Sequence, residues 1–169
     1  MPSNEPRFDR PPVRLAAVLR KRAWRITACC AIALALTSCG GCEGKPSNPW
    51  KSHTRGLPFV MDYAAGMEQA VLQRKPVLLF FTATWCGPCK QFSGDSFTHP
   101  DVQELMGQFV CVLVDGDADL DAMNRHGVRS YPTIILLSPA SQELDRFSGY
   151  RSRDEFQGML AKALAESAD

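Results

Sequence analysis

A Cys-x-x-Cys motif placed directly after an apolar run constrains this chain more than any other feature. The run Val77-Leu78-Leu79-Phe80-Phe81 precedes Trp85-Cys86-Gly87-Pro88-Cys89-Lys90. We interpret the run as a buried strand and Cys86 as the start of a helix, whose free N–H groups favour a thiolate. Cys89, one turn later, lies close enough to form a disulfide, and Pro88 fits the first helical turn because its missing N–H costs nothing there. The pattern is typical of a two-electron thiol–disulfide site.

A zinc site is the main alternative for two cysteines at this spacing. A structural zinc site needs four ligands, usually from a second Cys pair or a His pair. After the motif, the sequence offers only His99, Cys111 and His126, which are scattered singly. We therefore predict redox chemistry and no metal. The alternative is a metal-binding or chaperone module that holds its ion on Cys86 and Cys89, with His99 as a further ligand.

The motif resembles the active site of thioredoxins, and the wider chain resembles the C-terminal thioredoxin-like domain of the DsbD family of thiol–disulfide interchange proteins. The resembling stretches are Lys75-Pro76-Val77-Leu78-Leu79, Phe97-Thr98-His99-Pro100-Asp101-Val102-Gln103, Val112-Leu113-Val114-Asp115, Tyr131-Pro132-Thr133 and Phe147-Ser148-Gly149-Tyr150. The resemblance covers about residues 57–169. It implies an α/β thioredoxin fold, with a central mixed β-sheet flanked by helices, and a thiol–disulfide oxidoreductase activity.

The resemblance also assigns roles to the two cysteines. Cys86 is the attacking nucleophile and Cys89 the resolving thiol. Attack on a bulky protein disulfide requires an exposed thiolate, so we expect Cys86 to be exposed at the start of its helix. Trp85 is expected to shield one side of the site.

A second loop completes the site implied by the resemblance. Tyr131-Pro132-Thr133 matches the family's cis-proline loop, in which the backbone of the residue before the proline holds a substrate peptide in extended form. The alternative is a trans proline that starts a strand. The expected substrate-binding residues are Trp85, Gly87, Pro88, Tyr131 and Pro132.

Three positions depart from the resembling families. Thioredoxins carry a buried Asp six residues before the first Cys, where this chain has Phe80, and DsbD-like domains carry an acid just before the Trp, where it has Thr84. The Lys that accompanies the buried Asp aligns with Cys111. A buried charge without its partner costs several kcal/mol, so we infer that the pair was replaced as a unit and that proton transfer is affected. We interpret Cys111 as a core residue, with a third redox thiol as the alternative.

The N-terminal residues 1–38 resemble a bacterial lipoprotein signal peptide. They carry seven Lys or Arg against two acidic residues, followed by an apolar stretch from Ile26 to Leu36. That stretch has the length of a signal-peptide core and is too short to span a bilayer. Leu36-Thr37-Ser38-Cys39-Gly40 resembles a lipobox, so Cys39 is the predicted lipidation site. An ordinary secretory signal is the alternative.

The remaining chain divides into a tether and one domain. Residues 39–56 are rich in Gly, Pro, Ser and Asn and are predicted to be a flexible tether; Cys42 within it is interpreted as a passive residue. Residues 57–169 have the size of one domain. Without residues 1–38, Lys plus Arg falls from 19 to 12 and Asp plus Glu from 18 to 16, for a net charge of −4. No basic surface for nucleic acid is indicated.

The hydrophobic pattern places the secondary structure. Helices are expected from Asp62 to Gln73, from Cys86, over Val102–Met106, from Asp117 to His126, and after a capping box at Ser152-Arg153-Asp154-Glu155. Strands are expected over Val77–Thr82, Val110–Val114, Thr133–Leu137 and Leu144–Phe147. This order of strands and helices is that of a sheet covered by helices.

These observations favour an extracytoplasmic oxidoreductase that exchanges a Cys86–Cys89 dithiol with protein disulfides. The Gly-Pro between the cysteines resembles reducing thioredoxins, so a reductant is favoured. The sequence has no flavin or nicotinamide motif, so we expect the chain to bind no cofactor. We expect its electrons to come from the thiols of a membrane protein. A lipid anchor would hold the domain on the periplasmic or extracellular side. The alternative is an oxidase or isomerase with the same cysteines, and redox potential distinguishes the two.

Overall fold

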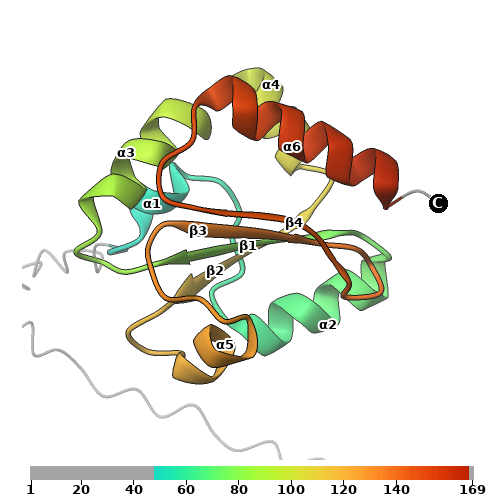
Figure 1. The fold of residues 1–169 in the computed structure, drawn as a ribbon, viewed down its shortest axis with the longest axis horizontal. Coiled ribbons are helices and arrows are strands. Elements are labelled where there is room, and N and C mark those ends of the chain that lie inside the picture. The colour runs from blue at the N-terminus through green and yellow to red at the C-terminus, as the bar shows by residue number, and fades with distance from the viewer. Residues whose placement is uncertain (1–47, 168–169) are drawn as a thin grey trace, which may run out of the picture. The chain divides into compact units, whose positions relative to one another are not determined.

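The computed structural model describes residues 48–167 (Figure 1). Its elements are α1 (Lys51–Thr54), α2 (Tyr63–Gln73), β1 (Val77–Thr82), α3 (Gly87–Ser96), α4 (Pro100–Met106), β2 (Val110–Asp115), α5 (Leu120–Arg125), β3 (Thr133–Leu137), β4 (Glu143–Ser148) and α6 (Arg153–Glu166). The predicted signal peptide, Cys39 and Cys42 lie outside the described residues. No helix in 48–167 is long and apolar enough to cross a membrane.

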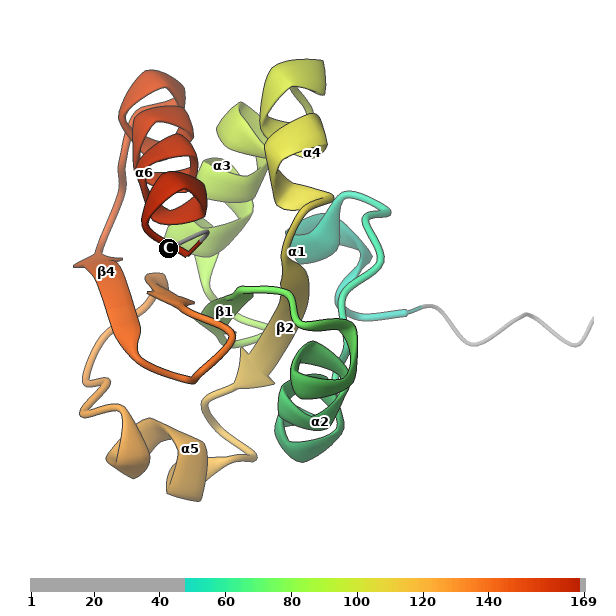
Figure 2. The same ribbon diagram turned by 90° about the vertical axis from the view of Figure 1, so that its right-hand side faces the viewer.

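The four strands form one mixed sheet in the order β2-β1-β3-β4. Strand β1 runs parallel to β2 and antiparallel to β3, and β3 and β4 form an antiparallel pair. All six residues of β1 are buried, as expected of a central strand with helices on both faces. Helices α3, α4 and α6 cover one face of the sheet, and α2 and α5 cover the other (Figures 1 and 2). This is the predicted α/β arrangement.

Alternate residues of β1 enter two separate cores, because successive side chains of a strand point to opposite faces. Leu78 and Phe80 belong to the core beneath α3, α4 and α6. Leu79 and Phe81 belong to the core against α2 and α5. The first core also contains Cys86 and Cys89, so the redox motif shares its core with a cluster of aromatic rings. The rings of this cluster are those of Phe80, Phe92, Phe97, Phe147 and Phe156.

Two of the expected helix starts are confirmed by their caps. The side chain of Asp62 accepts a hydrogen bond from the Ala65 amide at 2.7 Å and starts α2. Ser152 and Glu155 form the reciprocal capping box of α6. Helix α5 is shorter than the expected 117–126. The Asp115 carboxylate accepts a hydrogen bond from the Asp117 amide, and the Asp115 carbonyl oxygen accepts one from the Asp119 amide, so the residues before Leu120 form a turn.

The predicted tether is wrong in its last residues. Lys51–Thr54 form the short helix α1, in which His53 and Thr54 are buried. The ring of Trp50 packs edge-on against His53, with 5.3 Å between centroids, and Trp50 also packs against the first core. The Gly, Pro and Ser content upstream obscured this segment, whose aromatic residues bury enough apolar surface to dock. Helix α1 lies beside α3 (Figure 1).

Candidate redox site

The turn between β1 and α3 places the two cysteines. Cys86 has extended backbone angles and is the N-cap of α3, and Pro88 lies in the first turn. Cys86 and Cys89 form a disulfide with their Cα atoms 5.3 Å apart. The amide of Cys89 donates a hydrogen bond to the Cys86 sulfur at 3.2 Å. The same amide is therefore positioned to stabilise a thiolate on Cys86 once the disulfide is reduced.

Cys86 is less accessible than the sequence suggested. In the disulfide it is 2% exposed, against 0% for Cys89, because its sulfur is bonded to Cys89 within the first core. The neighbouring Trp85 is 67% exposed, and Gly87 and Pro88 are exposed. These three residues provide exposed surface next to the buried disulfide.

The proline loop lies beside the motif. The Tyr131–Pro132 peptide bond is cis, the geometry that the resemblance implied. The rings of Tyr131 and Trp85 meet edge to face with centroids 5.9 Å apart. Trp85 and Tyr131, widely separated in sequence, thus form one wall of the site.

Asp117, which sequence reasoning missed, fixes this wall. The Trp85 indole N–H donates to an Asp117 carboxylate oxygen at 2.7 Å. Burial, followed by the charges of Asp117 and Asp115, raises the pKa of Tyr131 above its ordinary value. Gly116 gives the phenol room, because a Cβ there would lie 1.8 Å from the Tyr131 oxygen. The run Val114-Asp115-Gly116-Asp117 offered only an acidic turn as a sequence signal.

No Asp, Glu, Lys or Arg side chain is buried in the described part of the chain, where the buried basic group is the imidazole of His53. Phe80 is fully buried and packs edge-on against Phe97, with 5.5 Å between ring centroids. The position of the missing acid is therefore filled by an aromatic cluster. The core that holds the cysteines contains no carboxylate.

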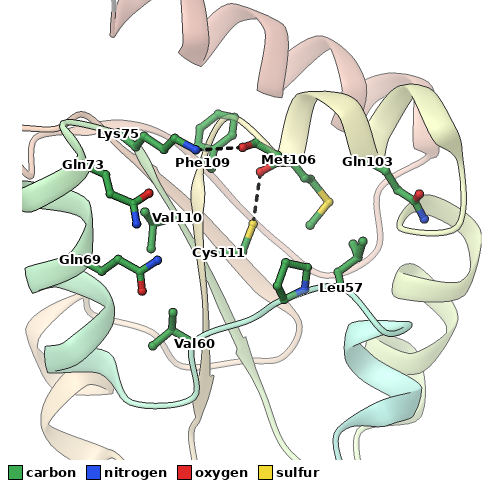
Figure 3. Close-up of a pocket in the computed structure, with 12 residues that line it drawn as sticks. Leu57, Val60, Gln69, Gln73, Lys75, Gln103, Met106, Phe109, Val110 and Cys111 are labelled. Atoms are coloured by element: carbon green, nitrogen blue, oxygen red, sulfur yellow. Dashed lines mark hydrogen bonds between the residues drawn. The ribbon is translucent and has the colours of Figure 1, made fainter.

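Cys111 lies away from the disulfide, near the start of β2. It pairs with Leu78 across the sheet, and its thiol lies 3.6 Å from the carbonyl oxygen of Met106. It borders a cavity of about 240 Å³ whose rim includes Lys75 and Gln103 (Figure 3). Burial raises the pKa of the Cys111 thiol to about 12, so the thiol is protonated at neutral pH.

His99 does not show the surroundings of a metal ligand. It is the N-cap of α4, and its ring lies 3.4 Å from the guanidinium of Arg153 on α6. Within residues 48–167, no group of three or more His, Cys, Asp or Glu side chains is arranged to hold an ion.

Comparison with known proteins identifies the family. The sequence profile of a family described as a thioredoxin-like domain matches residues 63–164. This chain belongs to the thioredoxin-like family. Its redox motif, cis-proline loop and mixed sheet all lie in the matched segment, and members of the family are thiol–disulfide oxidoreductases.

Relatives fall into two groups. The chain is 32% identical over 95 residues to thioredoxin M4 of Arabidopsis thaliana chloroplasts, covering 54% of this chain and 46% of that protein. It is 27% identical over 125 residues to the thiol:disulfide interchange protein DsbD of Pectobacterium atrosepticum, covering 69% of this chain and 22% of that protein. The chain thus spans less than half the length of either relative.

Solved structures agree with the fold. A thioredoxin from Thermus thermophilus superposes with a TM-score of 0.59 at 25% identity, covering 63% of this chain and 87% of that one. A DsbH oxidoreductase superposes with a TM-score of 0.53 at 18% identity, covering 64% of this chain and 86% of that one. The second likeness supports the fold alone.

Proposed function

We propose that this chain is an extracytoplasmic protein-disulfide reductase that uses Cys86 and Cys89. The observation that carries the proposal is the disulfide at the N-cap of α3, where the Cys89 amide contacts the Cys86 sulfur at 3.2 Å. A helix N-terminus supports the thiolate that disulfide exchange requires. Gly87 and Pro88 between the cysteines are the pair found in reducing thioredoxins.

The loop at Tyr131 supports a peptide-binding role for the site. Among the described residues, neither the amide nor the carbonyl of Tyr131 has a hydrogen-bond partner, although every residue of β3, which starts at Thr133, is paired with both β1 and β4. Such free backbone groups pair with an extended segment of another chain. Trp85, Gly87 and Pro88 provide exposed surface beside it.

The proposed reaction transfers two electrons. The Cys86 thiolate attacks one sulfur of a substrate disulfide, which breaks that bond, forms a mixed disulfide and releases the other substrate sulfur as a thiol after it takes a proton. Cys89 then loses its proton and attacks the Cys86 sulfur. This step forms the Cys86–Cys89 disulfide and releases the second substrate thiol. A dithiol donor must reduce the pair again before the next cycle.

The location is a separate part of the proposal. The basic region, the apolar stretch and the Leu-Thr-Ser before Cys39 support export and lipid attachment. An exported domain without a nicotinamide or flavin site needs a membrane protein as electron donor. The similarity to DsbD proteins is consistent with such a donor.

The direct test is reduction of insulin disulfides by the full chain with dithiothreitol as electron source. We expect the chain to accelerate the reduction, Cys86→Ser to abolish the acceleration, and Cys111→Ala to leave it unchanged. If the chain adds nothing to dithiothreitol alone, the proposed function is wrong. Stoichiometric zinc or copper on Cys86 and Cys89 in that same preparation would establish the metal-binding alternative.

A further inference from the structure

Helix α1 contacts the turn that precedes the redox disulfide. The carbonyl oxygen of Ala83 accepts a hydrogen bond from the Cys86 amide at 2.9 Å, and the Nε2 atom of His53 lies 3.1 Å from the same oxygen. A carbonyl oxygen only accepts hydrogen bonds, so Nε2 carries the proton and donates it. One imidazole from outside the motif therefore shares an acceptor with the nucleophilic cysteine.

The surroundings of His53 keep this arrangement fixed. The side chain is fully buried, and burial, followed by the charge of Lys90, holds its pKa below the ordinary value. The imidazole is therefore neutral at neutral pH. Its other nitrogen lies 3.4 Å from the Ser52 hydroxyl, which can donate to it. Each ring nitrogen thus faces a group of suitable hydrogen-bonding character.

The C-terminal end of α1 contacts the helix on the other side of the disulfide. The Arg55 guanidinium donates to the carbonyl oxygen of Lys90, the residue after Cys89, and to the Ser93 hydroxyl at 3.3 Å. The Ser93 hydroxyl also lies 3.1 Å from the carbonyl oxygen of Ser52. Gly94 leaves space for this contact, since a Cβ there would lie 2.8 Å from Arg55 Nη2.

We propose that His53 and Arg55 are positioning residues that set the reduction potential of the Cys86–Cys89 couple. We call the two residues with their acceptors, Ala83 and Lys90, the α1 brace. The inference rests on the proposed function, since it concerns the equilibrium of the same dithiol. Neither residue touches the reacting sulfur atoms; both hold the backbone on either side of them.

The brace acts mainly on the reduced state. In the oxidised state the covalent bond itself keeps Cys86 next to the start of α3. In the reduced state only non-covalent contacts keep the Cys86 sulfur near the Cys89 amide, which stabilises the thiolate. Loss of the brace therefore destabilises the dithiol form relative to the disulfide. The couple becomes harder to reduce, and less of Cys86 is thiolate at a given pH.

Two variants of His53 separate hydrogen bonding from packing. His53→Leu removes the donor, and His53→Gln can still present an N–H near the position of Nε2. We expect His53→Leu to lower the equilibrium constant for reduction by glutathione at least about threefold, equivalent to about 14 mV. The same variant should also show a lower rate of Cys86 alkylation by iodoacetamide at pH 7. His53→Gln should restore most of both values.

Two surface variants test the Arg55 contact without altering the core. Arg55→Gln removes the charge, and Gly94→Ala keeps the charge but displaces the guanidinium. Both variants should lower the equilibrium constant for reduction by glutathione and the rate of Cys86 alkylation, as His53→Leu does. Lys51→Gln is the matched control, because it removes an exposed charge from the same helix, and it should match the wild-type chain.

All measurements use the full chain, with circular dichroism to establish that each variant is folded. A wild-type chain that does not equilibrate with glutathione contradicts the proposed function itself. A wild-type chain that equilibrates, with Arg55→Gln and Gly94→Ala unchanged, overturns the Arg55 part of the brace. Equal shifts in His53→Leu and His53→Gln overturn the role of the Nε2 donor. If His53→Leu does not fold, His53→Gln and the two surface variants decide the proposal.

Discussion

Phe80 and Cys111 lie on the same face of the sheet, one diagonal step apart. Phe80 is directly opposite Leu113, and Cys111 is opposite Leu78. Both belong to the core that contains the redox cysteines. The two positions that resembling proteins fill with an Asp and a Lys are thus close enough to have been replaced together. Nothing charged takes their place in that core.

The missing acid predicts a slow resolution step. Without a buried carboxylate, Cys89 must lose its proton to water or to a partner. We expect Phe80→Asp to accelerate resolution of the mixed disulfide about tenfold near neutral pH. The variant should also lose about 3–5 kcal/mol of stability, because it buries an unpaired charge and removes a packed ring. Stopped-flow reduction of a small disulfide and denaturant melts measure the two effects.

Two further variants control this prediction. Phe80→Asn is matched in size but cannot take a proton, so it should destabilise the fold without accelerating resolution. Phe80→Asp combined with Cys111→Lys should recover part of the lost stability. An unchanged rate in Phe80→Asp would mean that the proton leaves Cys89 by another route.

The geometry of the disulfide predicts unequal roles for its two cysteines. Both sulfurs are buried in the disulfide, but Cys86 is at the N-cap and its sulfur accepts a hydrogen bond from the Cys89 amide, whereas Cys89 lies inside the first turn of α3. Cys89→Ala should therefore accumulate mixed disulfides with substrate proteins, and Cys86→Ala should not. Non-reducing gels of cell extracts measure this. Equal trapping by both variants would show that the assigned roles are wrong.

Gly116 is predicted to be required for the wall of the site that Trp85 and Tyr131 form. Because its added Cβ would lie 1.8 Å from the Tyr131 oxygen, Gly116→Ala must displace that ring. We expect a loss of about 1–3 kcal/mol of stability and about a tenfold lower rate of protein-disulfide reduction. Gly158→Ala, in α6 with nothing within 4 Å of its added Cβ, is the control and should be neutral or slightly stabilising. Similar losses in both variants would contradict the role of Tyr131.

The buried thiol of Cys111 predicts an alkaline loss of stability. Burial raises its pKa from 9.0 to about 12, so above pH 9 the folded state holds a proton that the unfolded state has released. This contribution is complete below pH 9 and decreases as pH rises towards 12, by about 1.4 kcal/mol per pH unit. Denaturant melts of the wild-type chain and Cys111→Ala between pH 8 and 11 should diverge accordingly. Parallel pH profiles would show that Cys111 is not buried as a neutral thiol.

Cys39 is predicted to anchor the chain. Cys39→Ser should release the protein from membranes or block its processing, because the sulfur that accepts the lipid is missing. Fractionation of cells that express each form measures this. A processed Cys39→Ser protein that stays in the membrane fraction would rule out lipid anchoring at this residue.

The sequence was sufficient for the parts of the site that depend on local pattern. The apolar run before Cys86 predicts β1, and the capping residues Asp62 and Ser152 predict two helix starts that the structure confirms. These features depend on neighbours within one or two helical turns. The order of elements predicted a sheet covered by helices, and the resemblance of the motif to thioredoxins implied the thioredoxin fold.

The parts that could not be predicted depend on contacts between distant residues. The bond from His53 to Ala83 spans 30 residues, and the bond from Trp85 to Asp117 spans 32. Neither has a periodicity or spacing that marks it in the sequence. The burial of Cys86 depends on the packing of its disulfide into the first core, which is likewise a tertiary property.

The reduction potential of the Cys86–Cys89 couple in the full chain tests the central claim most directly. It is measured by equilibrating the chain with glutathione or dithiothreitol buffers and counting alkylated thiols. The proposed reductase role predicts a value near that of thioredoxin, about −270 mV. A value at or above about −180 mV, in the range of isomerases and oxidases, would contradict it.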